Sequence, residues 1–237
     1  MQLAPDLFTG TAITDLLRFA GLGALLGLDV VSFPQAMLSR PLVSATLAGA
    51  LAGRPLAGLL VGAVLELFAL ETLPVGASRY PEWGSAAVVA GALFASFPEI
   101  RPGTLCLSVL CGLVTAYVGG LSMVVLRRLN GRLARDRLDR LAAGSGATVV
   151  GLQLAGLALD LLRGFALTIV ALGLALPLGR FAVGHWGADG RVSRAVVVGL
   201  AATVAGAALW NLFHAVPRAR WLFAGGIAVG LAALAFR

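Results

Sequence analysis

The sequence predicts an all-α protein, a polytopic membrane helix bundle with short re-entrant or broken helices in its N-terminal half. Apolar residues make up 59% of the 237 residues and charged residues only 12%, about half the charge of an ordinary soluble domain. The mean hydropathy is +0.94, and the apolar residues fall in long runs with few or no charges. Between Ser39 and Glu82, two Arg-Pro-Leu sequences interrupt the apolar pattern, so this part of the chain differs from the long apolar runs.

The apolar runs supply the candidate spanning helices. Several approach or exceed the roughly 20 residues that a helix needs to cross about 30 Å of hydrocarbon. The runs are Ala86–Phe97, Leu105–Leu126, Ala147–Leu178, Ala195–Phe213 and Leu222–Phe236. Nothing else is long or polar enough to form a soluble domain, so residues 1–237 are expected to form a single membrane domain in the lipid bilayer.

The first helical candidate is Thr11–Val31, which contains Asp15, Arg18 and Asp29. Asp15 and Arg18 are three residues apart, which places opposite charges on one helix face, so we expect a neutralised structural pair. No basic region precedes this stretch and no small-residue cleavage site follows it. The stretch is therefore expected to be retained and not removed as a signal peptide.

The region from Ser39 to Glu82 contains two copies of a short motif, Arg40-Pro41-Leu42 and Arg54-Pro55-Leu56. Proline suits the first turn of a helix, where its missing N–H is no loss, so each copy predicts a helix start. A helix from Pro41 to about Ala52 would rise only about 18 Å and could not span the bilayer. The apolar residues after Pro41 favour a re-entrant segment over a surface connector, and such segments indicate the substrate site of a transporter.

The second half of the chain is simpler. The run Ala147–Leu178 would be about 48 Å long as one straight helix, so we expect it to be tilted, kinked or broken. A polar connector, Gly179–Arg194, follows it. Two shorter spans then close the chain, separated by Pro217-Arg218-Ala219-Arg220.

The basic residues are unevenly placed. All 18 are arginines, and six of them lie between Arg127 and Arg140. Short loops rich in Lys and Arg stay on the cytoplasmic side during insertion. We therefore predict a cytoplasmic Arg-rich loop at about 127–146, which anchors the topology, and no nucleic-acid partner despite the net charge of +7.

Two sets of ionisable residues in apolar surroundings need an explanation. Glu66 has no basic residue within four positions, so its carboxylate needs a cavity, a partner from another element or a ligand. It could equally accept hydrogen bonds from backbone amides of the same broken region. Asp160 and Arg163 have the spacing of an ion pair near the middle of an apolar run, and structural and functional roles are both open.

Asp29 and Gln35 bracket the turn that leads into the first Arg-Pro-Leu motif, where either could cap a helix or face a ligand. The sequence contains no HExxH, CxxC, Walker loop or GxSxG motif and no cluster of potential metal ligands. We therefore expect no catalytic residue, no metal and no cofactor. Cys106 and Cys111 differ by about 140° of helix turn and are interpreted as small apolar groups.

Several motifs together resemble one transporter family. The motifs are Gly27-Leu28-Asp29, Gln35, Ser39-Arg40-Pro41-Leu42-Val43, Gly62-Ala63-Val64-Leu65-Glu66-Leu67, Val75-Gly76-Ala77 and Pro81-Glu82. They resemble the IIC subunits of mannose–fructose–sorbose permeases of the phosphotransferase system (PTS). The likeness is specific over residues 27–92 and only hydropathic after residue 190. Glu71 and Tyr80 depart from the family pattern.

The resemblance implies a multi-pass protein of the bacterial inner membrane that is not itself an enzyme. Such a chain pairs with a IID membrane subunit, in a homo- or hetero-oligomer, and moves a hexose that soluble IIA and IIB subunits phosphorylate. The phosphocarrier residues would belong to those partners. The sugar would be bound by Glu66, Gln35 and Asp29, since a neutral sugar needs hydrogen-bond acceptors and donors in a cavity.

Two other functions stay open on the sequence. The first is an uptake subunit that works without phosphoryl transfer. The second is a degenerate IIC-like scaffold or sensor subunit, which only holds a IID partner and has no transport activity.

Overall fold

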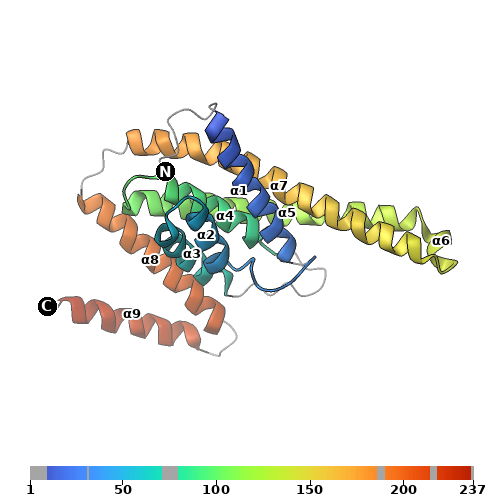
Figure 1. The fold of residues 1–237 in the computed structure, drawn as a ribbon. Helices are drawn as coiled ribbons and strands as arrows, with labels where there is room; N and C mark the ends of the chain where they lie inside the picture. The colour runs from blue at the N-terminus through green and yellow to red at the C-terminus, as the bar shows by residue number, and fades with distance from the viewer. Residues whose placement is uncertain (1–9, 31, 71–79, 186–189, 214–217, 236–237) are drawn as a thin grey trace.

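A computed structural model describes residues 10–30, 32–70, 80–185, 190–213 and 218–235, and the regular elements in these ranges are helices (Figure 1). The all-α prediction is confirmed. The helices are α1 (Gly10–Asp29), α2 (Pro41–Leu51), α3 (Pro55–Ala69), α4 (Trp83–Ser96), α5 (Pro102–Arg135), α6 (Leu138–Ala142), α7 (Gly146–Gly184), α8 (Gly190–Phe213) and α9 (Ala219–Ala235).

Helix α4 forms the centre of the bundle. Its residues from Trp83 to Ala95 are all buried, and α1, α2, α3, α5 and α7 pack around it. Small residues make this possible, because Gly84 lies against the backbone of Leu26 and Gly91 against the backbone of Ala45. A helix that is apolar on every side is buried on every side, and α4 follows that rule.

Helices α2 and α3 form the predicted pair of short helices. Each begins with its proline in the first turn, Pro41 and Pro55, and a turn through Gly53, with φ of 75°, joins them. Gly49 and Gly58 meet backbone to backbone, so the helices lie too close for side chains between them. At 11 residues, α2 rises about 16 Å, which confirms a helix too short to span a bilayer.

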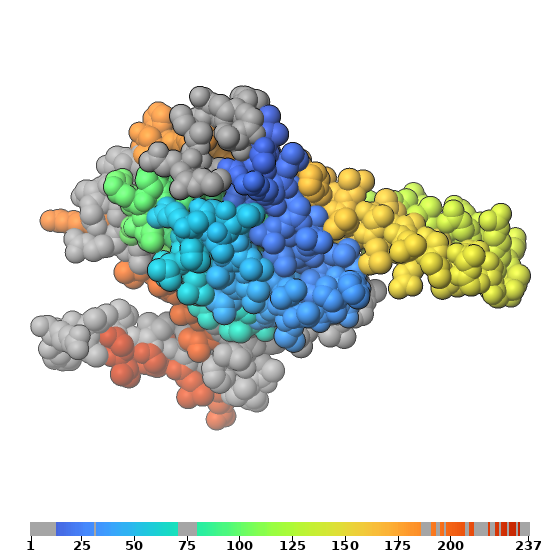
Figure 2. Space-filling model, in the orientation of Figure 1, coloured from blue at the N-terminus to red at the C-terminus, as the bar shows by residue number. Residues whose placement is uncertain are grey.

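Helices α5 and α7 are long and apolar enough to cross a membrane. They pack against each other and extend beyond the bundle as a hairpin closed by α6 (Figures 1 and 2). One sequence expectation needs correction here, because the Arg-rich stretch, predicted as a loop, is mostly helical and α5 continues to Arg135. The run Ala147–Leu178 was expected to be tilted, kinked or broken. It is not broken, since it lies within one 39-residue helix that contains Pro177.

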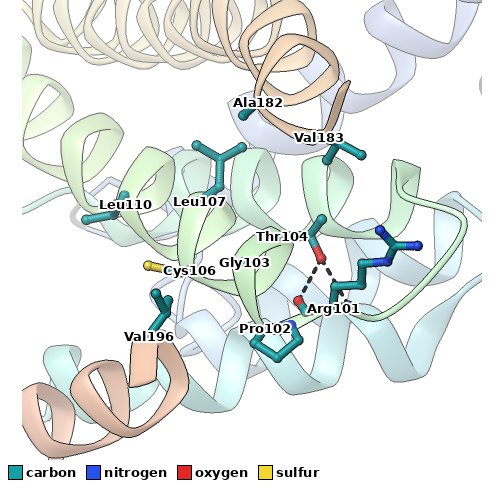
Figure 3. Close-up of a pocket in the computed structure, with 10 residues that line it drawn as sticks. All are labelled: Arg101, Pro102, Gly103, Thr104, Cys106, Leu107, Leu110, Ala182, Val183 and Val196. Atoms are coloured by element: carbon teal, nitrogen blue, oxygen red, sulfur yellow. Dashed lines mark hydrogen bonds between the residues drawn. The ribbon is translucent and has the colours of Figure 1, made fainter. Parts of the chain in front are cut away.

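The chain from residue 179 onwards is also more helical than expected. The predicted polar connector Gly179–Arg194 is helical up to Gly184 and again from Gly190. Helix α8 packs on α3 and α5, and Val196 of α8 and Cys106 of α5 line a common pocket (Figure 3). Helix α9 contacts α8. These two helices correspond to the two closing spans of the sequence analysis.

Candidate functional site

A pocket of about 230 Å³ lies where the loop after α1 meets the start of α2 and the residues that precede α4. Its wall combines carboxylate, amide, hydroxyl, guanidinium and aromatic groups. The residues that line it are Asp29, Val30, Gln35, Met37, Ser39, Arg40, Pro41, Tyr80, Pro81 and Trp83. Two of the three predicted site residues, Asp29 and Gln35, therefore come together in one pocket.

Asp29 organises the loop that forms one side of this pocket. Its carboxylate is 2% exposed and accepts hydrogen bonds from the backbone N–H groups of Ala36 (2.7 Å) and Ser39 (2.8 Å). Gln35 and Met37 in the same loop have φ near +60°, a conformation that costs non-glycine residues roughly 1–3 kcal/mol each. The two hydrogen bonds to Asp29 help to hold the loop in this conformation and place Gln35 on the pocket wall.

Glu66 is paired with Arg40, the residue that precedes α2. Arg40 donates from Nε to Oε1 of Glu66 at 2.6 Å and forms an ion pair with the same oxygen through Nη2. The other oxygen of Glu66 accepts the N–H of Leu42 at 3.0 Å, one of the amides at the start of α2 that have no partner within the helix. Glu66 thus has both a side-chain partner from another element and a backbone partner. It does not itself line the pocket, but its partner Arg40 does.

The opposite wall of the pocket is fixed to α5. The hydroxyl of Tyr80 accepts a hydrogen bond from Nη2 of Arg127 at 2.6 Å, and the guanidinium lies 5.0 Å from the centre of the tyrosine ring. This distance is typical of a cation–π contact. Tyr80 and Trp83 are both buried, so they present ring surface to the pocket from fixed positions.

A buried ionic cluster lies next to the pocket. Asp160, 1% exposed, pairs with Arg163 (2.8 Å and 2.9 Å) and accepts the hydroxyl of Ser32 at 2.5 Å. Arg163 also donates to Ser122 at 3.2 Å. The predicted Asp160–Arg163 pair is therefore present, and it attaches the loop after α1 to α7. The predicted Asp15–Arg18 pair is also present, at 3.3 Å with Arg18 exposed.

Glu82 is a buried acid that the sequence analysis named only as part of the Pro81-Glu82 motif and did not predict as a site residue. It is 0% exposed, and its Oε1 accepts the backbone N–H of Ser85 at 3.0 Å, which caps α4. The other oxygen has no hydrogen-bond partner among the described residues. One signal could have found it, namely an acid three residues ahead of a serine at the start of an uncharged apolar run.

Arg40, Tyr80 and Trp83 were likewise not predicted as site residues, because their roles depend on contacts between distant parts of the chain. The quoted motif Val75-Gly76-Ala77 and the unusual Glu71 lie outside the described residues.

The family comparison fits these features. The family described as PTS system sorbose-specific IIC component matches residues 16–217, which is most of the chain. The chain belongs to this family. As a IIC chain it is a membrane-embedded subunit of a PTS sugar permease, and the IIC family is a family of transport subunits. A comparison with curated proteins finds no match.

Solved structures support the fold of this IIC chain. A structure titled "Structure of membrane protein" has a TM-score of 0.67 and 17% identity, and the match covers 97% of this chain and 92% of that one. The structure titled "CryoEM Structure of Mannose Transporter ManYZ and Microcin E492 (MceA) complex" has a TM-score of 0.59 and 19% identity, covering 100% and 89%. At these identities the likeness concerns the fold alone.

Proposed function

We propose that this IIC chain binds a hexose and moves it across the bacterial inner membrane for phosphorylation by partner subunits. Membership of the sorbose-specific IIC family is the observation that carries the proposal. The similar fold in a structure of a mannose transporter, ManYZ, agrees with it. A IID membrane subunit and soluble IIA and IIB subunits would complete the system, and the phosphocarrier residues would belong to them.

We assign the sugar to the pocket at the start of α2, with Glu66, Gln35 and Asp29 as its main hydrogen-bonding residues. An ionised carboxylate offers about four acceptor positions. Arg40 and the backbone N–H of Leu42 occupy only some of the acceptor positions of the Glu66 carboxylate. A sugar hydroxyl can therefore bind Glu66 and Arg40 together, as a donor to the first and an acceptor from the second.

The remaining residues of the pocket suit a neutral sugar. Gln35 offers both donors and an acceptor, while Asp29 offers acceptors alone. Tyr80 and Trp83 contribute ring faces, against which the C–H face of a pyranose can pack. Binding sites for small molecules usually combine such apolar walls with a few fixed polar groups.

The test is hexose uptake in bacteria that lack their own permeases for the sugar. The cells express this chain with its IID, IIA and IIB partners, and matched cells lack only this chain. We expect uptake as sugar phosphate that depends on this chain and on IIB. Accumulation of free sugar without IIB would instead indicate an uptake subunit without phosphoryl transfer. A stable complex with IID that neither binds nor moves sugar would indicate a scaffold or sensor subunit.

A further inference from the structure

The hairpin that extends beyond the bundle has two unlike sides. We call it the arm and define it as residues 127–159, which include the end of α5, all of α6 and the start of α7 (Figures 1 and 2). Its two helices lie side by side, since a side chain at Gly156 of α7 would contact Asn130 of α5. These parts of α5 and α7 therefore lie at the same level along the arm, and the surroundings of the arm can contact both helices.

The α5 side of the arm is basic. Arg128, Arg132 and Arg135 are spaced by four and three residues, which places them on one helix face. All three are exposed, and none forms an ion pair with any residue that the structure describes. The whole arm contains six arginines and only two acidic residues, Asp136 and Asp139.

The α7 side of the arm is apolar. No charged residue occurs from Gly146 to Leu159. Val149, Val150 and Leu154 are exposed, the last by 61%. Val150 and Leu154 share one helix face with Leu161 further along. Large side chains in such a stripe are unfavourable in water, where their apolar surface stays hydrated.

Neither of the two simple placements of the arm suits both sides. An arm that stands free in the cytoplasm would expose the apolar stripe of α7 to water. An arm within the hydrocarbon would leave the unpaired arginines of α5 without water or a counter-ion, which is expensive for charged side chains. A two-helix element with one basic and one apolar side fits the boundary between headgroups and hydrocarbon.

We propose that the arm lies in the interface of the bilayer, with the apolar side of α7 toward the acyl chains and the arginines of α5 on the phosphates of anionic lipids. Charge complementarity selects this occupant, since the excess of arginine over aspartate on the arm matches an anionic lipid surface. Arginine also suits phosphate, because its planar guanidinium can donate two parallel hydrogen bonds.

The experiment uses the full chain reconstituted in vesicles of phosphatidylcholine and phosphatidylglycerol. Cys106 and Cys111 are first replaced by alanine, and single cysteines are placed at Leu154 or Arg132 and labelled with a small fluorophore. Brominated acyl chains quench fluorophores in hydrocarbon, and iodide on both sides of the membrane quenches those in water. A cysteine at Val125, an exposed position of α5 within its apolar run, is the control for acyl-chain contact.

We expect brominated lipid to quench position 154 as strongly as position 125, and iodide to quench position 132. Quenching of position 154 by iodide would overturn the proposal in favour of an arm in water. Quenching of position 132 by brominated lipid would overturn it in favour of an arm in the hydrocarbon. If neither agent reached position 154, another protein surface would cover the arm, and the proposal would again be wrong.

The anionic part of the proposal has its own measurement. In Arg128→Gln/Arg132→Gln/Arg135→Gln protein labelled at position 154, quenching by brominated lipid should no longer depend on the phosphatidylglycerol content. Each arginine at an anionic surface favours binding by about fivefold, so the wild-type arginines should give a clear dependence. The matched control is Arg180→Gln, which changes an arginine at the other end of α7. An equal dependence in the triple variant would overturn the role of the arginines.

Discussion

Arg40, which precedes α2, and Glu66, near the end of α3, form an ion pair. The pair closes the α2–α3 hairpin at the end opposite its Gly53 turn. Arg40 also donates to the carbonyl of Ala69 at 3.4 Å. One guanidinium therefore satisfies a side-chain carboxylate and a helix-terminal carbonyl, and it stands on the wall of the pocket that we assign to the sugar.

The first prediction is that Glu66→Gln weakens sugar binding by the assembled transporter. The change keeps the shape of the side chain but replaces a charge-assisted acceptor with a neutral amide, at a cost of about 1–3 kcal/mol. This corresponds to roughly one to two powers of ten in affinity. Calorimetric titration of the folded variant with its IID partner measures the change.

Glu99→Gln is the control for this experiment, because Glu99 pairs with Arg101 at an exposed position away from the pocket. Its sugar affinity should equal that of the wild type. A Glu66→Gln protein that melts at a lower temperature but binds sugar normally would make Glu66 a structural residue of the hairpin.

The second prediction concerns the buried pair between Asp160 and Arg163. Asp160→Asn leaves the charge of Arg163 without its partner in a buried site, and breaking such pairs costs about 3–5 kcal/mol. Glu99→Gln removes an acid from the exposed pair with Arg101 and should cost less than about 1 kcal/mol. Thermal unfolding of the two purified variants in one detergent compares them. Equal melting temperatures would show that the burial of Asp160 adds nothing to stability.

The third prediction tests the close contact between the two broken helices. A β-carbon at Gly58 would clash with the carbonyl group of Ala45, so Gly58→Ala must push α2 and α3 apart, at a cost of about 1–3 kcal/mol. Gly173→Ala in α7 meets open space and should stabilise the protein by up to about 1 kcal/mol, since alanine favours helix. The melting temperatures of the two variants measure these opposite effects. An unchanged melting temperature for Gly58→Ala would contradict the tight packing of α2 against α3.

The fourth prediction is that the tip of the arm faces the cytoplasm. Arg137 lies in the exposed turn between α5 and α6, so a cysteine there is accessible to a water-soluble reagent. In a background without Cys106 and Cys111, an impermeant maleimide should label Arg137→Cys only after the cells are opened. Labelling in intact cells would place the arm outside and contradict the positive-inside assignment.

Local chemistry explains which parts of the fold could be predicted. The starts of α2 and α3 follow from Pro41 and Pro55, because proline's preference for the first helical turn needs no tertiary contact. The Asp160–Arg163 pair follows from spacing on one helix. The Arg-rich stretch was predicted as a loop from its charge, yet arginine is a good helix former, and α5 continues into it as far as Arg135 with α7 alongside.

The candidate site was predictable only in part. Asp29 and Gln35 were found because they lie close in sequence to the first Arg-Pro-Leu motif, and both line the pocket. The partner of Glu66 was not found, because Arg40 lies 26 positions away and becomes its neighbour only when α3 folds back on α2. Glu82 was missed because its burial depends on α4 lying at the centre of the bundle.

The sequence by itself determined the membrane environment, the helical class, the two short helices and the family, since composition, hydrophobic runs and local motifs are properties of neighbouring residues. Only the tertiary structure decided which charges meet. It paired Glu66 with Arg40, attached Ser32 to Asp160, enclosed Glu82 and set a basic helix beside an apolar one in the arm. The physical reason is that ion pairing and burial depend on distance in space, which the packing of α4 against its neighbours fixes.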